Sequence, residues 1–161
     1  MSNTLQKLLN GRKAFTGLVK AKISGKRIPV RVSLLVTKFC NLSCFYCYAE
    51  DILNKKEVEE FSLKELKDII DQVYDAGCRW INILGGEPLL RNDIEELIDY
   101  MHRKGIFIEM TTNGYFIKKR ISALKKVDHL AISLDGNKET NDRARGEDSF
   151  EKILAGIECA V

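Results

Sequence analysis

The sequence has no long hydrophobic run, and this limits where the protein can reside. No apolar stretch approaches the ~18 residues that a membrane-spanning helix requires. The first residues, MSNTLQKLLNGRK, also lack the apolar segment of a secretory signal peptide. We therefore expect a cytoplasmic protein without a membrane span.

Charge of one sign is not in strong excess either. The 26 Lys and Arg residues against 23 Asp and Glu give a net charge of +3, which does not predict a nucleic-acid partner. The only local basic excess covers residues 12–31. Its simplest interpretation is a solvated segment that leads into the domain, with a phosphate or a membrane surface as the alternative. With 45% hydrophobic residues over 161 positions, the composition predicts one globular domain or a large part of one.

A disulfide framework is not expected, although the chain has five cysteines. Thiols stay reduced in the cytosol, and clustered thiols there indicate metal binding or redox catalysis. Cys40, Cys44 and Cys47 form such a cluster in CNLSCFYC. Cys78 and Cys159 lie elsewhere, and we interpret them as structural or incidental thiols, because free cysteine behaves as a small buried hydrophobe.

Strand and helix signals alternate along most of the chain. Runs of β-branched and aliphatic residues predict strands at residues 30–36, 79–84, 106–112 and 129–135. Amphipathic periodicity predicts helices at residues 62–77, 92–105, 118–127 and 149–160. This alternation is typical of a parallel sheet with right-handed crossovers, and the apolar strands indicate a sheet covered on both faces.

Local signals define the ends and the inner faces of these helices. Ser62 opens a capping box at the start of the first helix. Asn92 is expected to cap the second helix and Gly105 to end it. In the third helix we expect Ile121 and Leu124 to face the core.

Residues 1–29 form a lead-in segment that is distinct from the rest of the chain. Apolar positions within residues 4–20 predict short helices, interrupted by Gly11 and Gly17. The core domain is expected to occupy residues 30–161.

A polar or glycine-containing motif follows each predicted strand. In chain order these motifs are CNLSCFYC, GGEP, TNG and DG. The carboxyl ends of parallel strands lie at one edge of the sheet, where α/β proteins bind their ligands. We therefore expect the four loops to converge on one site.

The three clustered thiols are one ligand short of a usual metal site. A structural zinc ion takes four protein ligands, and neither His102, near a helix end, nor His129, at the far edge of the sheet, suits as the fourth. A [4Fe–4S] cluster also usually takes four thiolates. An iron left open would make room for a substrate, as the open position of a catalytic zinc does. The spacing C-x3-C-x2-C therefore favours a cluster with one open iron.

The chain resembles the radical S-adenosylmethionine (radical SAM) superfamily. CNLSCFYC is similar to its three-cysteine signature, with Tyr46 as the aromatic residue before the last cysteine, and GGEP, TNG and SLDG follow in the family's order. The run SLDGNKETNDRARGEDSF resembles the branch that includes peptide maturases and enzymes of molybdenum-cofactor and haem biosynthesis. The resemblance covers about residue 30 to the end.

The resemblance implies an α/β fold, namely a partial (β/α) TIM-like barrel with parallel strands. About four of the six β/α units are present, so the core domain is expected to be incomplete at its C-terminus. We interpret the chain as a fragment of a longer enzyme, with a split gene or a degenerate product as alternatives.

The resemblance also implies the cofactors and the reaction. A [4Fe–4S] cluster on the three cysteines would bind S-adenosylmethionine at its open iron and cleave it reductively. Methionine and a 5′-deoxyadenosyl radical result, and the radical takes a hydrogen atom from a substrate. The expected partners are S-adenosylmethionine, a low-potential electron donor such as flavodoxin or ferredoxin, and an unknown substrate, either a peptide or a small metabolite.

The resemblance assigns residues on the first two loops to S-adenosylmethionine. Glu87, with the backbone of Gly85 and Gly86, is expected to receive its ammonium group. In isolation GGEP predicts a simple turn between a strand and a helix. Tyr46 is expected beside the adenine, the alternative being a loop aromatic that covers the core.

Residues on the third and fourth loops are assigned in the same way. Asn113 and Ser133 are expected to hydrogen-bond the ribose or the methionine carboxylate, the alternative being turn or cap residues. Asp135 is expected to accept ribose hydroxyls or to shape the turn with Gly136. Arg145 is expected to pair with the cosubstrate carboxylate or to stay solvated.

Two other classes of function remain open on these residues. A metal-binding module without radical chemistry, holding zinc or a cluster, would not need the GGEP and TNG loops. An inactive scaffold that needs a partner chain is favoured only by the missing strands.

Overall fold

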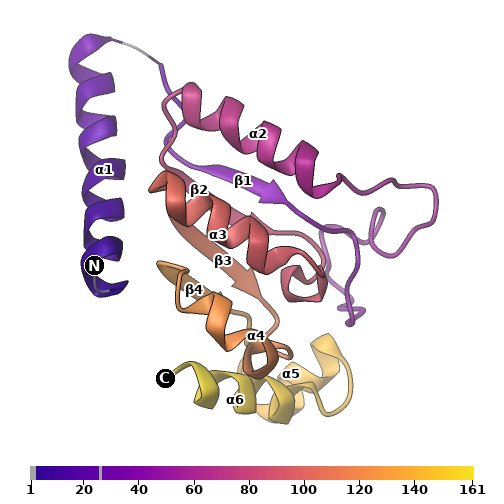
Figure 1. Ribbon diagram of the computed structural model, residues 1–161. Helices are drawn as coiled ribbons and strands as arrows, with labels where there is room; N and C mark the ends of the chain where they lie inside the picture. Colours follow the sequence, from indigo (N-terminus) through magenta and orange to yellow (C-terminus); the bar gives the residue numbers. More distant parts are fainter. Residues whose placement is uncertain (1–2, 26) are drawn as a thin grey trace.

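The computed structural model describes residues 3–25 and 27–161, and helices and strands alternate along it (Figure 1). The helices are α1 (Asn3–Ser24), α2 (Leu63–Asp75), α3 (Ile94–Lys104), α4 (Ile117–Leu124), α5 (Lys138–Arg145) and α6 (Ser149–Ala160), with a short 3-10 helix, η1 (Pro88–Leu90). The strands are β1 (Val32–Leu35), β2 (Trp80–Leu84), β3 (Phe107–Thr112) and β4 (His129–Ile132).

The four strands form one parallel sheet in the order β1-β2-β3-β4. Each strand therefore lies beside the strand that precedes it in the chain. Figure 1 shows α2 and α3 side by side on one face of the sheet. The predicted α/β class is confirmed, with parallel strands and four β/α units of a partial barrel.

The hydrophobic core lies between the sheet and the helices on this face. Leu34, Ile83 and Met110 occupy paired positions on neighbouring strands, and all three are buried. They belong to one cluster with the inner residues of α2 and α3, which are Leu66, Ile70, Ile94, Leu97, Ile98 and Met101. Burial of each such side chain stabilises the fold by about 1.5–3 kcal/mol.

The opposite face of the sheet carries polar residues. Ser33, Asn82, Glu109 and His129 pair in register across the four strands. Ser33 and His129 are exposed, so the prediction that the sheet is covered on both faces is wrong, because alternate residues of each strand point to this polar side. Glu109 is buried, and Arg31 Nε lies 2.9 Å from its carboxylate, the kind of partner that a buried charge requires.

Helix α1 is one continuous helix rather than the short helices that were predicted. It lies across the amino ends of the strands (Figure 1), where the buried Asn10 donates from Nδ2 to the carbonyl of Ile106 at 3.3 Å. Gly11 and Gly17 do not interrupt it, since both lie on its inner side, next to Phe107 and Arg79 respectively. Among the described residues, no helix is long and apolar enough to cross a membrane.

Some predicted helix details differ from the structure. Asp93, not Asn92, occupies the N-cap position of α3. Asp93 gives no side-chain cap, because Arg91 binds its carboxylate at 2.5 Å. In α4 the backbone leaves helical geometry at Arg120. This kink turns Ile121 outward to 37% exposure, so the prediction that it faces the core is wrong.

The capping box of α2 is confirmed. Ser62 Oγ accepts from the backbone N–H of Glu65, and the Glu65 carboxylate accepts from the backbone N–H of Ser62 at 2.8 Å. Substituting Ser62→Ala is expected to lower the free energy of unfolding by about 1 kcal/mol, because one N–H of the first turn loses its acceptor. Thermal denaturation measures this. Ser122→Ala, at an exposed site within α4, is the control and should not lower Tm, because alanine favours helix at least as well as serine does.

Candidate active site

The carboxyl ends of the four strands surround one cavity, as predicted from the four loop motifs. Its volume is about 180 Å³. Residues from all four loops line it, together with Arg145 from the end of α5. Those of the predicted site are Cys40, Cys44, Tyr46, Cys47, Gly85, Gly86, Asn113, Ser133 and Arg145.

The cysteine loop presents its three thiols, each half-buried, to this cavity. Asn54 holds the first of them in place: its Oδ1 accepts from the Cys40 N–H and its Nδ2 donates to the Cys40 carbonyl, both at 3.1 Å. Asn54 adopts a left-handed φ of 56°, which asparagine tolerates better than most residues. The backbone N–H of Leu42 donates to Cys40 Sγ at 3.4 Å. The sequence did not point to Asn54, because the only hint it offers is that asparagine tolerates a left-handed φ.

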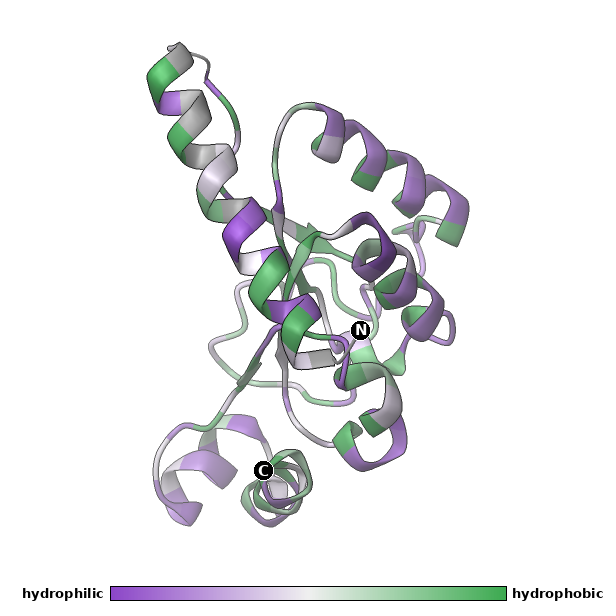
Figure 2. Cartoon of the chain, turned by 60° about the vertical axis from the view of Figure 1, so that its left-hand side comes forward, coloured by the Kyte–Doolittle hydropathy of each residue, from purple (hydrophilic) through white to green (hydrophobic). Residues whose placement is uncertain are grey.

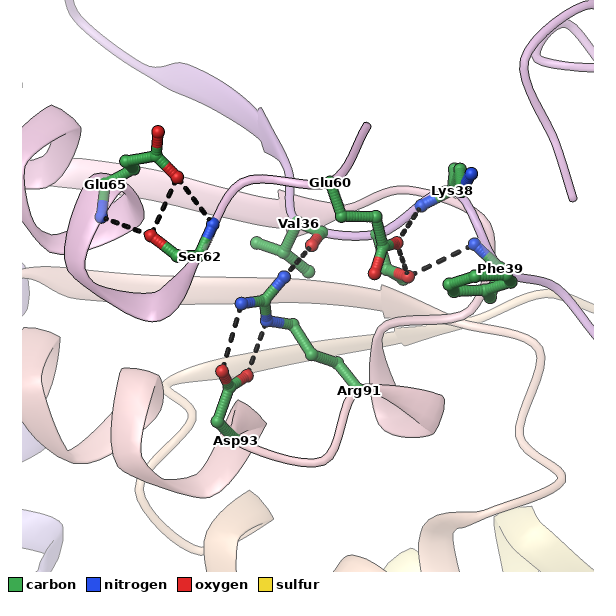
Figure 3. A network of polar contacts seen from close by, with 9 residues as sticks. Val36, Lys38, Phe39, Glu60, Ser62, Glu65, Arg91 and Asp93 are labelled. Carbon is green, nitrogen blue, oxygen red and sulfur yellow. Dashed lines mark hydrogen bonds and ion pairs between the residues drawn. The ribbon is translucent and has the colours of Figure 1, made fainter. Parts of the chain in front are cut away.

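A polar network joins the two ends of the long connection between β1 and α2 and ties its start to the rest of the domain (Figure 3). The Glu60 carboxylate accepts from the backbone N–H of Lys38 at 2.7 Å. Arg91 Nη1 donates to the Val36 carbonyl at 2.8 Å while its Nε pairs with Asp93. The cysteine loop is therefore anchored at its start, close to Cys40.

The second loop packs directly against the cysteine loop. The N–H of Gly86 donates to the Thr37 carbonyl at 2.8 Å, and the N–H of Glu87 donates to the Phe39 carbonyl at 2.7 Å. A Cβ on Gly85 would lie 2.4 Å from the Thr37 oxygen, and one on Gly86 would lie 2.2 Å from the Phe39 oxygen. Both glycines are required because two backbone segments meet here.

Glu87 lies beneath the cavity, outside its lining. Its side chain is fully buried, and its carboxylate accepts from Thr112 Oγ1 at 2.8 Å and from the N–H groups of Leu89 at 3.0 Å and Asn113 at 2.7 Å. Burial raises the pKa of Glu87, and these three donors oppose that rise. The carboxylate thus joins the second loop to the third, a role that the sequence did not indicate.

Asn113 connects the third loop to the cysteine loop. Its Nδ2 donates to Asn41 Oδ1 at 2.8 Å, and its Oδ1 accepts from the N–H of Tyr115 at 3.1 Å. Ser133 follows β4, and its N–H donates to the Thr112 carbonyl at 3.0 Å. Asn41 is a second residue that sequence reasoning missed, since an asparagine within a cysteine motif carries no distinctive signal.

Tyr46, Asp135 and Arg145 form a contact between the cysteine loop, the fourth loop and α5. The Tyr46 hydroxyl donates to Asp135 Oδ2, and Arg145 Nη2 donates to Asp135 Oδ1 at 3.2 Å. Arg145 Nε lies 2.8 Å from Oδ2, but its hydrogen is not directed at an acceptor, so that contact is an ion pair only. The arginine depends on α5, a helix that was not predicted.

The electrostatics of this triad follow from its contacts. Burial and the bond to Asp135 raise the pKa of Tyr46 to about 12. Although burial opposes the shift, the bonds from Arg145 and Tyr46 lower the pKa of Asp135. Burial likewise opposes a rise in the pKa of Arg145, but Asp135 raises it. At neutral pH the tyrosine is therefore neutral and the other two are charged.

Replacing Asp135→Asn is expected to lower the pKa of Tyr46 from about 12, because the phenolate would no longer face a carboxylate. The measurement is a titration of tyrosinate absorbance, with the Tyr46→Phe protein subtracted to isolate this residue. Asp68→Asn, on the exposed side of α2, is the control. An unchanged Tyr46 transition in Asp135→Asn would contradict the assigned contact.

The side chains in the cavity that could bind a metal are thiols, and there are three of them rather than four. The lining contains no carboxylate or imidazole. Among the residues that the structure describes, no three Cys, His, Asp or Glu side chains lie close enough to hold one metal ion. Thiolates favour iron–sulfur clusters and zinc, and a cubane bonds each thiolate through a different iron, which suits thiols that share a cavity without meeting at one point.

Binding of a cluster or a metal ion would release protons from the thiols. Burial raises the pKa of the Cys40 thiol, and a hydrogen bond from Leu42 partly offsets it. Burial also raises the pKa of Cys44, with the nearby Arg145 acting in the opposite direction. The thiols must lose their protons on binding metal, so affinity should rise with pH.

The two remaining cysteines lie away from the cavity, as predicted. Cys78 is buried at the amino end of β2, where its thiol donates to the Trp80 carbonyl at 3.1 Å. Cys159 is exposed near the end of α6.

The fold is a parallel α/β partial barrel, and its site combines three cysteines with a glycine loop at the carboxyl edge of the sheet. This combination matches one superfamily of proteins. Residues 34–161 match the Radical SAM superfamily, and the chain belongs to that superfamily. It is 35% identical over 145 residues to the mycofactocin maturase MftC of Mycolicibacterium smegmatis, covering 88% of this chain and 36% of the relative. It is 38% identical over 129 residues to the Fe-coproporphyrin III synthase of Methanosarcina barkeri, covering 76% of this chain and 31% of the relative.

Solved structures share the same fold. SuiB of Streptococcus suis bound to S-adenosylmethionine superimposes with a TM-score of 0.69 at 23% identity, covering 89% of this chain and 35% of that chain. The AdoMet-bound anSMEcpe superimposes with a TM-score of 0.63 at 24% identity. The match covers 80% of this chain and 39% of that chain. The chain therefore spans about a third of these proteins.

Proposed function

We propose that the protein binds a [4Fe–4S] cluster through Cys40, Cys44 and Cys47 and uses it to cleave S-adenosylmethionine. When bound, these groups supply a 5′-deoxyadenosyl radical that abstracts hydrogen from a substrate. The observation that carries the proposal is one cavity lined by three thiols and by the Gly85–Gly86 backbone, without a fourth ligand side chain among the residues lining it.

The residues of the cavity have distinct roles in this proposal. The backbone of Gly85 and Gly86 would face the cosubstrate, and Glu87 would position that loop from below through its bonds to the third loop. Asn113 and Ser133 line the cavity and offer polar side chains to the ribose or the carboxylate. The resemblance assigned the ammonium group to Glu87 together with the backbone of Gly85 and Gly86. Because the Glu87 carboxylate is buried, we propose that the glycine backbone alone faces this group.

Tyr46 and Arg145 would form the wall on the side of the adenine. Arg145 is 5.8 Å from the Tyr46 ring centroid and is paired with Asp135. We propose that Asp135 orients these two side chains rather than binding the ribose itself, because it does not line the cavity. The cationic Arg145 beside Cys44 would also stabilise the thiolate.

The substrate, the electron donor and the cellular location are further parts of the proposal. We propose a cytoplasmic enzyme that receives electrons from a low-potential donor such as flavodoxin or ferredoxin. Its substrate is a peptide or a small metabolite, since the similar proteins include a maturase of mycofactocin and a GTP 3′,8-cyclase of Aliarcobacter butzleri.

Anaerobic reconstitution tests the proposed reaction. The iron-loaded chain, incubated with dithionite and S-adenosylmethionine, is expected to form 5′-deoxyadenosine, measured by mass spectrometry. Protein without iron is the control and should form none. A chain that holds a cluster and forms no 5′-deoxyadenosine would instead be a metal-binding module. A chain that holds neither cluster nor cosubstrate firmly would be an inactive scaffold.

A further inference from the structure

Helix α1 presents hydrophobic side chains away from the domain. Leu8, Phe15, Val19 and Ile23, here called the α1 stripe, are 64%, 69%, 42% and 81% exposed. At 3.6 residues per turn they lie within about a quarter of the helix circumference, on the side opposite the buried Asn10. The usual arrangement of an amphipathic surface helix is reversed, because its apolar side faces outward. Figure 2 shows α1 across the front of the molecule, with hydrophobic segments recurring along it.

The charged residues on α1 itself are all basic. Arg12 and Lys22 are exposed beside the α1 stripe, and α1 contains no acidic residue. The first 49 residues hold nine Lys and Arg and no Asp or Glu, whereas the remaining residues hold 17 Lys and Arg against 23 Asp and Glu. The positive charge is therefore concentrated in the first 49 residues of the sequence, which include α1.

We propose that the α1 stripe docks onto an anionic phospholipid surface, with the helix lying in the plane of the interface. Helices that bind in this way combine an apolar side containing Leu and Phe with flanking Lys and Arg, and they do not cross the bilayer. The stripe extends roughly 22 Å along the helix at 1.5 Å per residue. Its length and its flanking positive charges match a flat bilayer surface, with anionic headgroups above an apolar acyl region.

The chemistry of the stripe favours lipid over a protein partner. Protein interfaces are anchored mainly by Trp, Tyr and Arg in fitted pockets, whereas the stripe is a convex row of aliphatic side chains with one Phe. A second copy facing it through the same helix would bring cations against cations. The acyl region of a bilayer adapts its shape to a convex apolar row, and anionic headgroups neutralise the flanking charges.

The position of α1 makes such docking compatible with the active site. The helix lies at the amino ends of the strands, and the cavity lies at their carboxyl ends (Figure 1). A bilayer held against α1 would therefore leave the thiol-lined cavity on the far side of the sheet.

Vesicle flotation tests the proposal with the full chain. The chain is expected to float with vesicles of equimolar phosphatidylglycerol and phosphatidylcholine and to stay unbound with phosphatidylcholine alone. Phe15→Ser should weaken binding at least about tenfold, because one buried aromatic side chain is lost from the membrane. Replacing Arg12→Gln should weaken it about fivefold, and the remaining binding should fall as salt rises.

Matched variants keep the test decisive. Phe61→Ser removes a phenylalanine of similar exposure, 53%, outside α1 and should bind like the parent chain. Ile23→Ser provides a second stripe variant, and circular dichroism checks that each variant keeps its helix content. Equal binding to both vesicle types, no binding at all, or unchanged binding by both stripe variants would overturn the proposal. A dimer that Phe15→Ser dissociates would overturn it too, since the occupant would then be a second copy.

Discussion

Replacing Cys40, Cys44 or Cys47 by alanine is expected to abolish cluster binding. Each thiol lines the same cavity, and the lining offers no other thiol, carboxylate or imidazole to take its place. The parent chain, reconstituted without oxygen, should bind roughly four irons, whereas each variant should bind essentially none. Iron analysis and visible absorbance measure this result, and 5′-deoxyadenosine formation should disappear with the cluster.

The other two cysteines supply the controls for this experiment. Cys159→Ala changes an exposed thiol near the end of α6 and should leave iron content and stability unaltered. Cys78→Ala should lower Tm, because a buried thiol at the amino end of β2 is lost, yet it should keep the iron. Equal loss of iron in Cys78→Ala, or full iron in Cys40→Ala, would refute the assignment of the ligands.

Gly86→Ala is expected to lower the free energy of unfolding by at least about 3 kcal/mol and to disturb the cysteine loop. The added Cβ would lie 2.2 Å from the carbonyl oxygen of Phe39 and 3.0 Å from the N–H nitrogen of Cys40. These are backbone atoms, so no side-chain rotation relieves the clash. The two loops must separate, which breaks the hydrogen bond from Glu87 to Phe39. Denaturant unfolding and iron content of the variant measure both effects.

The same substitution elsewhere in the chain should act in the opposite direction. A Cβ on Gly11, in α1, would have its nearest neighbour 4.0 Å away on the Phe107 ring. Gly11→Ala should therefore raise stability by about 1 kcal/mol, because alanine favours helix more than glycine does. Gly86→Ala with parental stability and full iron would show that the contact between the two loops is not required.

The strands and most helices were predictable because their signals are local. The aliphatic runs of β1 to β4 and the Ser62 capping box depend only on neighbours in the sequence. Helix α5 was not predictable in this way. Its residues, KETNDRAR, form no apolar side, and the helix relies on the Asn137 cap and on the burial of Asn141 and Ala144 against the rest of the fold.

The convergence of the four loops was predictable from topology, but the contacts within the site were not. Parallel strands must end at one edge, so Cys40, Gly85, Asn113 and Ser133 had to lie near one another. The direction of the Glu87 side chain depends on donors from Thr112 and Asn113, which lie about 25 residues further along the chain. Such long-range hydrogen bonds leave no trace in a local motif.

The order of the strands has a consequence for how the protein is made. Because β1 to β4 are neighbours in the same order as in the chain, each strand can pair with the one synthesised just before it. At roughly 5–20 residues per second, the cysteine loop leaves the ribosome roughly 5–20 s before Arg145 emerges to complete its surroundings. During that interval the three thiols face solvent without the wall formed by Asp135 and Arg145. The three thiols are thus most exposed to oxygen and to stray metal ions in the nascent chain, and their surroundings are complete only after α5 has folded.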